Sequence, residues 1–207
     1  MHVIERIKTI LKTGYFAPKT WAFWRTLIIC FFVCNILGHG LEIVYCGAMN
    51  SLFGIIEDDY AALVDPWYVP YWVYGAGAVV MTLVLEPFKE HIIARRKTIW
   101  GALLQTFVIM VFLSMVLELF FGLLVNQPDP VTGLYPYWDN SQLPLNVFGQ
   151  AWLVNDVFIG LAAMVYLWIV FPVVSWASEK VRPLFANTAF ASTAAAFSTC
   201  CLFAYAL

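Results

Sequence analysis

The sequence predicts an all-α fold, a polytopic bundle of about five membrane-spanning helices. Of its 207 residues, 62% are hydrophobic and 12% are charged, whereas soluble domains carry about 25% charged residues. The apolar residues form long runs, close to the roughly 20 residues that cross a bilayer as a helix. The basic residues fall in alternate connections, as expected for loops on one side of a membrane. We expect spans at residues 22–47, 69–88, 99–125, 148–176 and 184–207.

Residues 1–20 precede the first span and predict an amphipathic helix on the membrane surface. Such helices place an apolar face in the bilayer interface and a basic face toward the headgroups; a frayed tail is the alternative. No small-residue cleavage site follows, so a secretory signal is not expected. The chain is predicted to comprise an interfacial segment, 1–20, and one transmembrane domain, 21–207. The apolar face consists of Val3, Ile4, Ile7, Ile10 and Leu11.

The distribution of Lys and Arg predicts that the N-terminus lies inside. All 11 basic residues occur up to Arg25, between the second and third spans, or between the fourth and fifth spans. The other two connections contain acidic residues and no basic ones. Because basic residues collect on the cytoplasmic side, the C-terminus is expected outside, and an even number of spans would break the pattern. With a net charge of −2, the composition indicates membrane lipids as partners and no nucleic acid.

Three carboxylates, Glu42, Glu118 and Asp156, fall inside the predicted spans. Counting about 1.5 Å per residue from the flanking basic residues places them at similar depth, in the outer part of the membrane. Ionisable groups in lipid usually face a protein interior or a wet cavity, so we expect one shared cavity. His39, one helical turn from Glu42, is the nearest titratable base. The cavity would hold protons, bind a cation or accept a cationic group; three separately bonded, protonated acids are the alternative.

Metal binding is the most specific form of this hypothesis. A divalent cation would be held by hard oxygen donors together with one imidazole. The single His makes the pattern weak. The predicted ligands are His39, Glu42, Glu118 and Asp156, with Asp139 as a further oxygen donor.

The connection before the fourth span, "LYPYWDNSQLPLN" (134–146), is polar between two apolar runs. Pro136 and Pro144 prevent a continuous helix, and the Asp, Asn and Ser between them commonly form turns and caps. The predicted orientation places this segment on the outer side, above the acids. We expect a lid or half-buried loop over the cavity; an ordinary interfacial loop is the alternative.

Short motifs occur at residues 38–42, 74–77, 117–118 and 138–149. They resemble those of the ABC-transporter type IV permease family of bacterial membrane proteins. A Gly-x-x-x-Glu segment ends the first span at Glu42, Tyr-Gly-x-Gly opens the second at Tyr74, and Leu-Glu closes the third at Glu118. The most specific motif is Trp-Asp-Tyr-Ser followed by Asn and Gly. Asn replaces its Tyr here, and Asp156 lies outside the family pattern. The resemblance covers about residues 28–176, and the last motif reads Trp138, Asp139, Asn140, Ser141, Asn146 and Gly149.

The resemblance implies a transport component of the bacterial cytoplasmic membrane. A separate ATPase would be required, because the chain contains no G-x-x-x-x-G-K-[ST] motif. The segment "KEHIIARRK" (89–97) could dock that ATPase or simply anchor the protein, with Glu86 and Glu90 as interfacial partners of its basic residues. The ligand-binding residues would be His39, Glu42, Tyr74, Glu118, Trp138, Asp139, Asn140, Ser141, Asn146 and Asp156.

Two other functions remain open from the sequence. In a membrane-embedded enzyme acting on a lipid or lipid-linked substrate, the acids would serve as general acid and base. In a scaffold or sensor, the outer loop would bind a partner and the acids would be structural. The last span, rich in Ala, Ser and Thr, would allow close helix packing within the chain or in a homo-oligomer. The sequence does not establish whether the protein is an enzyme.

Overall fold

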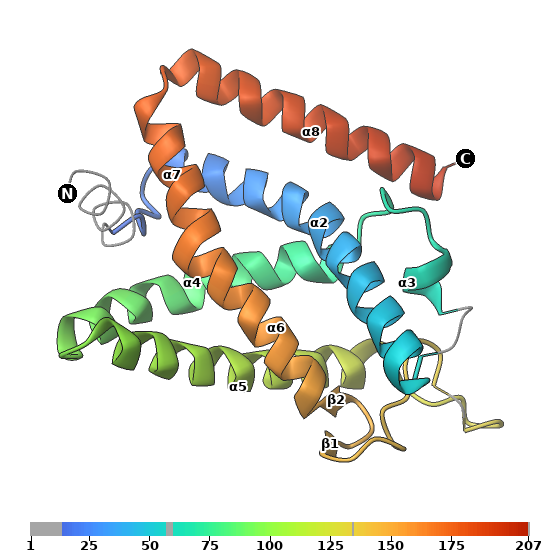
Figure 1. The fold of residues 1–207 in the computed structure, drawn as a ribbon. Coiled ribbons are helices and arrows are strands. Elements are labelled where there is room, and N and C mark those ends of the chain that lie inside the picture. The colour runs from blue at the N-terminus through green and yellow to red at the C-terminus, as the bar shows by residue number, and fades with distance from the viewer. Residues whose placement is uncertain (1–13, 57–59, 134, 207) are drawn as a thin grey trace. The chain divides into compact units, whose positions relative to one another are not determined.

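The computed structural model describes residues 14–56, 60–133 and 135–206, and these are predominantly helical (Figure 1). A single antiparallel pair of two-residue strands, β1 (Asn146–Val147) and β2 (Ala151–Trp152), precedes α6 within the described residues. The helices are α2 (Trp21–Phe53), α3 (Ala61–Val64), α4 (Trp72–Arg95), α5 (Ile99–Val125), α6 (Leu153–Val165), the π-helical η1 (Tyr166–Val170), α7 (Phe171–Lys180) and α8 (Pro183–Tyr205).

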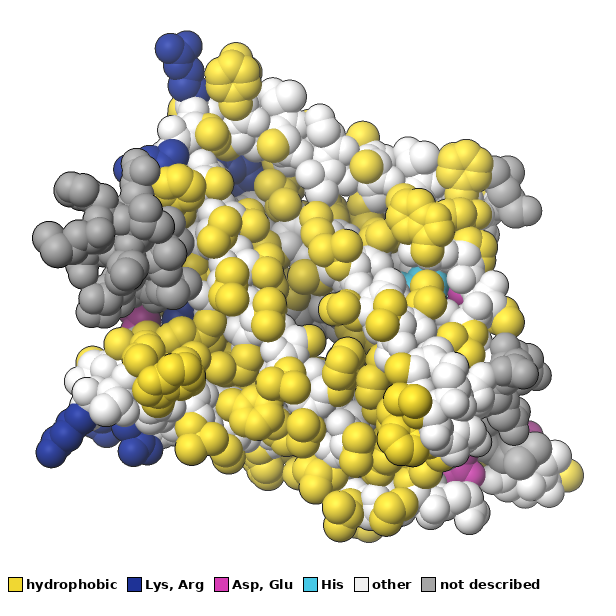
Figure 2. Space-filling model, viewed as in Figure 1, with side chains coloured by type: hydrophobic (Ala, Val, Ile, Leu, Met, Phe, Trp, Pro, Cys, Tyr) yellow, Lys and Arg dark blue, Asp and Glu magenta, His cyan; other side chains and the backbone are white. Residues whose placement is uncertain are grey.

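Four helical stretches of the described chain are long and apolar enough to cross a membrane. They are α2, α5, the continuous run of α6, η1 and α7, and α8. This finding supports an all-α, multi-pass membrane protein, and hydrophobic side chains are spread across the face shown in Figure 2. The remaining predicted span, 69–88, corresponds to α4, which is not among the four. The total of five spans therefore stays a prediction.

The start of the chain differs in part from the expectation. The amphipathic helix predicted within 1–20 falls mostly on residues 1–13, which lie outside the described residues. Residues 14–20 are not helical. The hydroxyl of Thr20 accepts a hydrogen bond from the N–H of Phe23 at 3.3 Å and so caps the start of α2. The helix then continues beyond the predicted end, residue 47, to Phe53, where Gly54 terminates it in the left-handed conformation (φ 64°).

The chain forms two compact units, residues 1–84 with 171–207, and residues 85–170. In the first unit, α2 packs against α7 and α8. Arg25, buried near the start of α2, donates to Asn187 Oδ1 and Ser178 Oγ at 2.8 Å each, which joins the three helices. Farther along, the rings of Phe32 and Phe197 stack with their centroids 4.7 Å apart. The prediction of one transmembrane domain over 21–207 stays a prediction.

In the second unit, α5 and α6 pack along a stripe that recurs at every fourth residue of α5. Most of these residues are small, and close packing of small residues favours helix association in lipid. On α6, a Cβ atom added to Gly160 would lie 2.6 Å from a methyl group of Val111. Glu118 lies on the same stripe, so its side chain faces α6. The buried members are Ala102, Thr106, Met110, Ser114 and Gly122.

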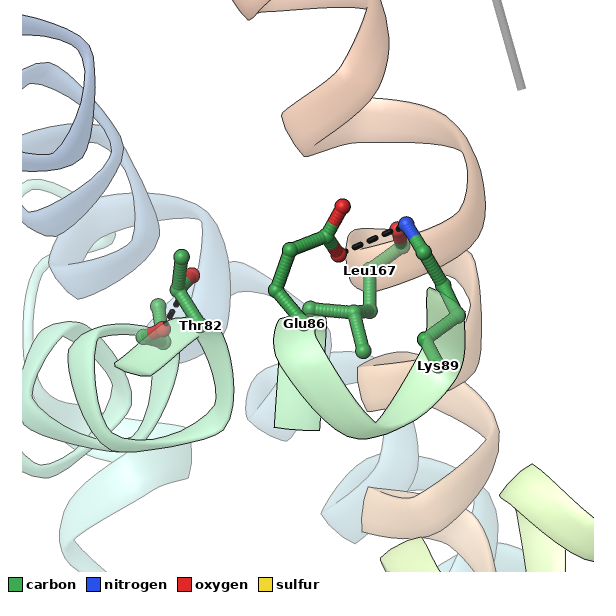
Figure 3. Close-up of polar contacts among 5 residues, drawn as sticks. Thr82, Glu86, Lys89 and Leu167 are labelled. Carbon is green, nitrogen blue, oxygen red and sulfur yellow. Dashed lines mark hydrogen bonds and ion pairs between the residues drawn. The ribbon is translucent and has the colours of Figure 1, made fainter. Parts of the chain in front are cut away.

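Pro172 accounts for the π-helical segment η1. Proline has no N–H and cannot donate to a carbonyl of the preceding turn, and a π-helix pairs residues five apart. The carbonyl of Leu167, five residues before Pro172, instead accepts a hydrogen bond from Lys89 Nζ at 3.0 Å (Figure 3). Lys89 therefore supplies the donor that the helix lacks.

Candidate functional site

In the first unit, the structure brings the predicted site residues His39, Glu42 and Tyr74 together, where α2 contacts the start of α4. Tyr74 Oη donates to Glu42 Oε2 at 2.5 Å. His39 is fully buried, and its Nδ1 lies 2.9 Å from the carbonyl oxygen of Val69. Its ring stacks on that of Tyr71, with centroids 4.0 Å apart and an interplanar angle of 11°. The Glu42 carboxyl group therefore accepts a hydrogen bond from the Tyr74 hydroxyl and lies near the His39 imidazole.

Two glycines allow α2 and α4 to approach this closely. A Cβ atom on Gly38 would lie 2.2 Å from Cγ of Tyr74, and one on Gly75 would lie 2.4 Å from Nδ2 of Asn35. Asn35 is fully buried, and its Oδ1 accepts a hydrogen bond from the N–H of Gly75 at 2.9 Å. Gly38 of the Gly-x-x-x-Glu motif and Gly75 of the Tyr-Gly-x-Gly motif thus have a packing role, and this packing places Tyr74 against Glu42.

In the second unit, the carboxyl group of Asp156 on α6 interacts electrostatically with that of Glu118 on α5. Glu118 Oε1 accepts a hydrogen bond from Asn155 Nδ2 at 2.6 Å, and its Oε2 accepts one from the N–H of Trp152 at 3.3 Å. Asp156 is fully buried, and within the described chain neither of its oxygens accepts from an N–H or O–H group. Two adjacent acids in an apolar interior cannot both ionise without a compensating charge. The pair can therefore take up one positive charge.

Two polar neighbours of this pair were not predicted. Asn155 supplies the hydrogen bond to Glu118 and directly precedes Asp156 in the sequence. Ser114 lies one turn before Glu118 on the same stripe of α5, and its buried hydroxyl has no hydrogen-bond partner among the described residues. The four-residue spacing between Ser114 and Glu118 is the only sequence signal that could have identified the hydroxyl.

The loop between α5 and α6 is fastened to the end of α5 by two buried amides. Asn126 Nδ2 donates to the carbonyl of Trp138 at 2.7 Å and to Gln150 Oε1 at 3.0 Å. Asn126 Oδ1 accepts from the N–H of Tyr137 at 3.0 Å, and Gln150 Nε2 donates to the carbonyl of Asn126 at 3.1 Å. These reciprocal bonds fix the loop above the end of the helix that carries Glu118.

The Trp-Asp-Asn-Ser motif folds this loop. Trp138 Nε1 and Asn140 Nδ2 both donate to the carbonyl of Gln150, at 2.9 and 2.7 Å. Asp139 Oδ1 accepts from the N–H of Ser141 at 2.8 Å, which is the turn role expected of Asp. These polar groups therefore have partners within the loop itself, and the choice between a lid over the cavity and an ordinary interfacial loop stays a prediction.

The Asn and Gly that follow the motif shape the β1–β2 hairpin. Asn146 Nδ2 donates to the carbonyl of Leu143 at 2.7 Å, and its Oδ1 accepts from the N–H of Gly149 at 2.9 Å. Gly149 has φ 69°, a conformation that glycine adopts without strain. Leu145 and Phe148 also have positive φ angles, 64° and 53°. Ligand binding by Asn146 and the four motif residues stays a prediction.

A buried ion pair lies in the C-terminal half of α4 (Figure 3). Lys89 Nζ is 2.6 Å from Glu86 Oε2, and the two side chains are 2% and 0% exposed. We expected Glu86 to pair with a basic residue at the membrane interface. Glu86 does pair with a basic residue, Lys89. The pair is buried rather than interfacial, because the Lys89 side chain extends to the carbonyl of Leu167 in η1.

The four predicted metal ligands divide between the two units. His39 and Glu42 belong to the first, and Glu118 and Asp156 belong to the second. Within the described residues, no group of three or more His, Cys, Asp or Glu side chains could hold a metal ion. The single cavity and the divalent-cation site therefore stay predictions.

Comparison with known proteins gives one family. Residues 29–204 match the model of the family described as "Putative ABC-transporter type IV". No curated protein and no solved structure matches the chain. The match runs from α2 into α8 and includes both carboxyl sites, which confirms the resemblance found in the short motifs. Because it covers well over half of the 207 residues, the chain belongs to this ABC-transporter type IV family.

Proposed function

We propose that the chain is the membrane-spanning subunit of a transporter in the bacterial cytoplasmic membrane, with a separate ATPase as its energy source. Family membership and the four apolar helical stretches support this proposal. Family membership supports an ATPase partner, and the nucleotide-binding motif G-x-x-x-x-G-K-[ST] does not occur in these 207 residues.

A five-span topology with a cytoplasmic N-terminus agrees best with the basic residues. It requires α4 to cross the membrane although it contains Glu86 and Lys89. The ion pair between these two side chains supports the crossing, because charges that are paired inside protein avoid the cost of exposure to lipid.

The observation that carries the proposed transport site is the contact between Glu118 and Asp156. Each acid lies in a helix of membrane-spanning length and composition. Among the described residues, no Lys, Arg or His interacts electrostatically with either carboxyl group. Paired ionisable groups of this kind commonly mark ion or substrate paths through membranes. The pair binds a small cation or the cationic group of a solute, and the hydroxyl of Ser114 is a further oxygen ligand.

Thermal unfolding in detergent, with a panel of metal cations and amine-bearing solutes, tests this site. We expect at least one panel member to raise the melting temperature, and we expect both Glu118→Gln and Asp156→Asn to abolish the rise. Each substitution removes one of the two negative charges that attract the ligand. Glu179→Gln, an exposed acid on α7, is the matched control and should retain the rise. A panel without effect, or stabilisation that persists in both variants, contradicts the proposal.

Cysteine accessibility tests the orientation. In a background with the five native cysteines replaced by Ser, we expect Trp138→Cys to react with a membrane-impermeant maleimide added to intact cells. Lys97→Cys, in the connection between α4 and α5, should react only after the membrane is opened. The reverse pattern would show that the outer and inner faces are exchanged.

A further inference from the structure

The connection between α4 and α5 borders a groove of about 320 Å³ along the first turns of α5. Its lining residues on α5 recur at intervals of three and four, so they share one helical face. Gly101 carries no side chain and leaves the end of the groove near the connection open. The lining consists of Arg96, Gly101, Leu104, Gln105, Val108 and Ile109.

The open end of this groove is cationic. Arg96 Nε donates to Gln105 Oε1 at 2.6 Å, which holds the guanidinium against α5. Arg95 and Lys97 are exposed on either side of it, and no Asp or Glu is among the lining residues. Guanidinium groups bind phosphate oxygens in a bidentate manner. The charge and the geometry of Arg96 therefore suit a phosphate group.

The other end of the groove is apolar and lies within a membrane-spanning helix. Leu104 and Val108 are 66% and 58% exposed, on a helix long and apolar enough to cross the bilayer. Figure 2 shows Lys and Arg side chains at the α4–α5 connection next to a hydrophobic helical surface. A ligand that fits this groove has an anionic headgroup near Arg96 and a hydrocarbon tail that extends along Leu104 and Val108.

We propose that this groove binds an anionic phospholipid, with its headgroup phosphate on Arg96 and the first part of an acyl chain along Leu104 and Val108. The basic connection places the site in the cytoplasmic leaflet, where anionic lipids are drawn to clustered Lys and Arg. The apolar wall favours a lipid over free phosphate. The site does not involve the residues of the proposed transport site, and its assignment to the cytoplasmic leaflet rests on the orientation proposed above.

Lipid titration of the delipidated protein, followed by native mass spectrometry, tests the proposal. Phosphatidylglycerol and phosphatidylcholine with identical acyl chains are the probes. We expect tighter binding of phosphatidylglycerol, and we expect Arg96→Gln to weaken it about fivefold, the effect of removing one cation near an anionic lipid. Arg96→Lys should retain part of the preference. Arg182→Gln, an exposed basic residue before α8, is the control and should bind like the unaltered protein.

Three outcomes would overturn this assignment. The first is equal affinity for the two lipids, or unchanged phosphatidylglycerol affinity in Arg96→Gln. The second is displacement of phosphatidylglycerol by excess inorganic phosphate, which would assign the groove to a free anion. The third is unchanged lipid binding together with loss of a co-purifying ATPase in Arg96→Gln, which would make Arg96 a protein-docking residue. Matching melting curves would establish that the variants are folded.

Discussion

We expect Lys89→Met to lower the free energy of unfolding by about 3–5 kcal/mol, the usual cost of removing one partner of a buried ion pair. The substitution leaves Glu86 fully buried without the ammonium group that lies 2.6 Å from its Oε2. It also removes the donor to the carbonyl of Leu167, where Pro172 cannot supply a helical hydrogen bond. Thermal or denaturant unfolding of the purified protein in detergent measures the loss.

Two further variants separate the ion pair from a general effect of charge. Lys97→Met removes an exposed cation from the connection that follows α4 and should change stability by no more than about 0.5 kcal/mol. Glu86→Leu combined with Lys89→Met should recover much of the loss, because neither charge then remains buried. If Lys89→Met unfolds like Lys97→Met, or if the double variant is as unstable as the single one, the pair does not stabilise α4.

The helices were predictable where capping residues coincide with the ends of apolar runs. α5 extends from Ile99 to Val125, as predicted, because Thr98 caps its start and the polar Asn126 follows its end. α6 begins at Leu153 rather than at residue 148, because the preceding residues form the β1–β2 hairpin. The bonds that build this hairpin join amide side chains to the backbone and do not affect hydropathy, so the apolar pattern could not reveal it.

The acids of the candidate sites were visible in the sequence because a carboxylate interrupts an apolar run. Asn155, the hydrogen-bond partner of Glu118, was not visible, since an Asn beside an Asp has no distinctive pattern and becomes relevant only when α5 and α6 pack. Trp138 and Asn140 were recognised by resemblance to a family motif. Their shared acceptor, the carbonyl of Gln150, depends on the folded path of the loop and could not be inferred from the residues alone.

We expect Gly38→Ala to destabilise the protein by about 1–3 kcal/mol through overpacking. The added methyl group would lie 2.2 Å from Cγ of Tyr74, so the ring or the helix that carries it must move. Movement of this ring weakens the hydrogen bond from Tyr74 Oη to Glu42. Gly40→Ala should instead be neutral or stabilising by up to about 1 kcal/mol, because Ala favours the helix and no other described group lies within 4 Å of the added carbon.

The two substitutions add the same methyl group to the same helix, so the difference between their unfolding free energies isolates the contact with Tyr74. Combining Gly38→Ala with Tyr74→Ala should reduce the loss of stability caused by the glycine substitution, because the aromatic ring that clashes with the added methyl group is then absent. Such non-additivity is expected between residues in contact. Equal stability of Gly38→Ala and Gly40→Ala would mean that α2 and α4 do not approach through Gly38. The arrangement that holds Glu42 would then need another explanation.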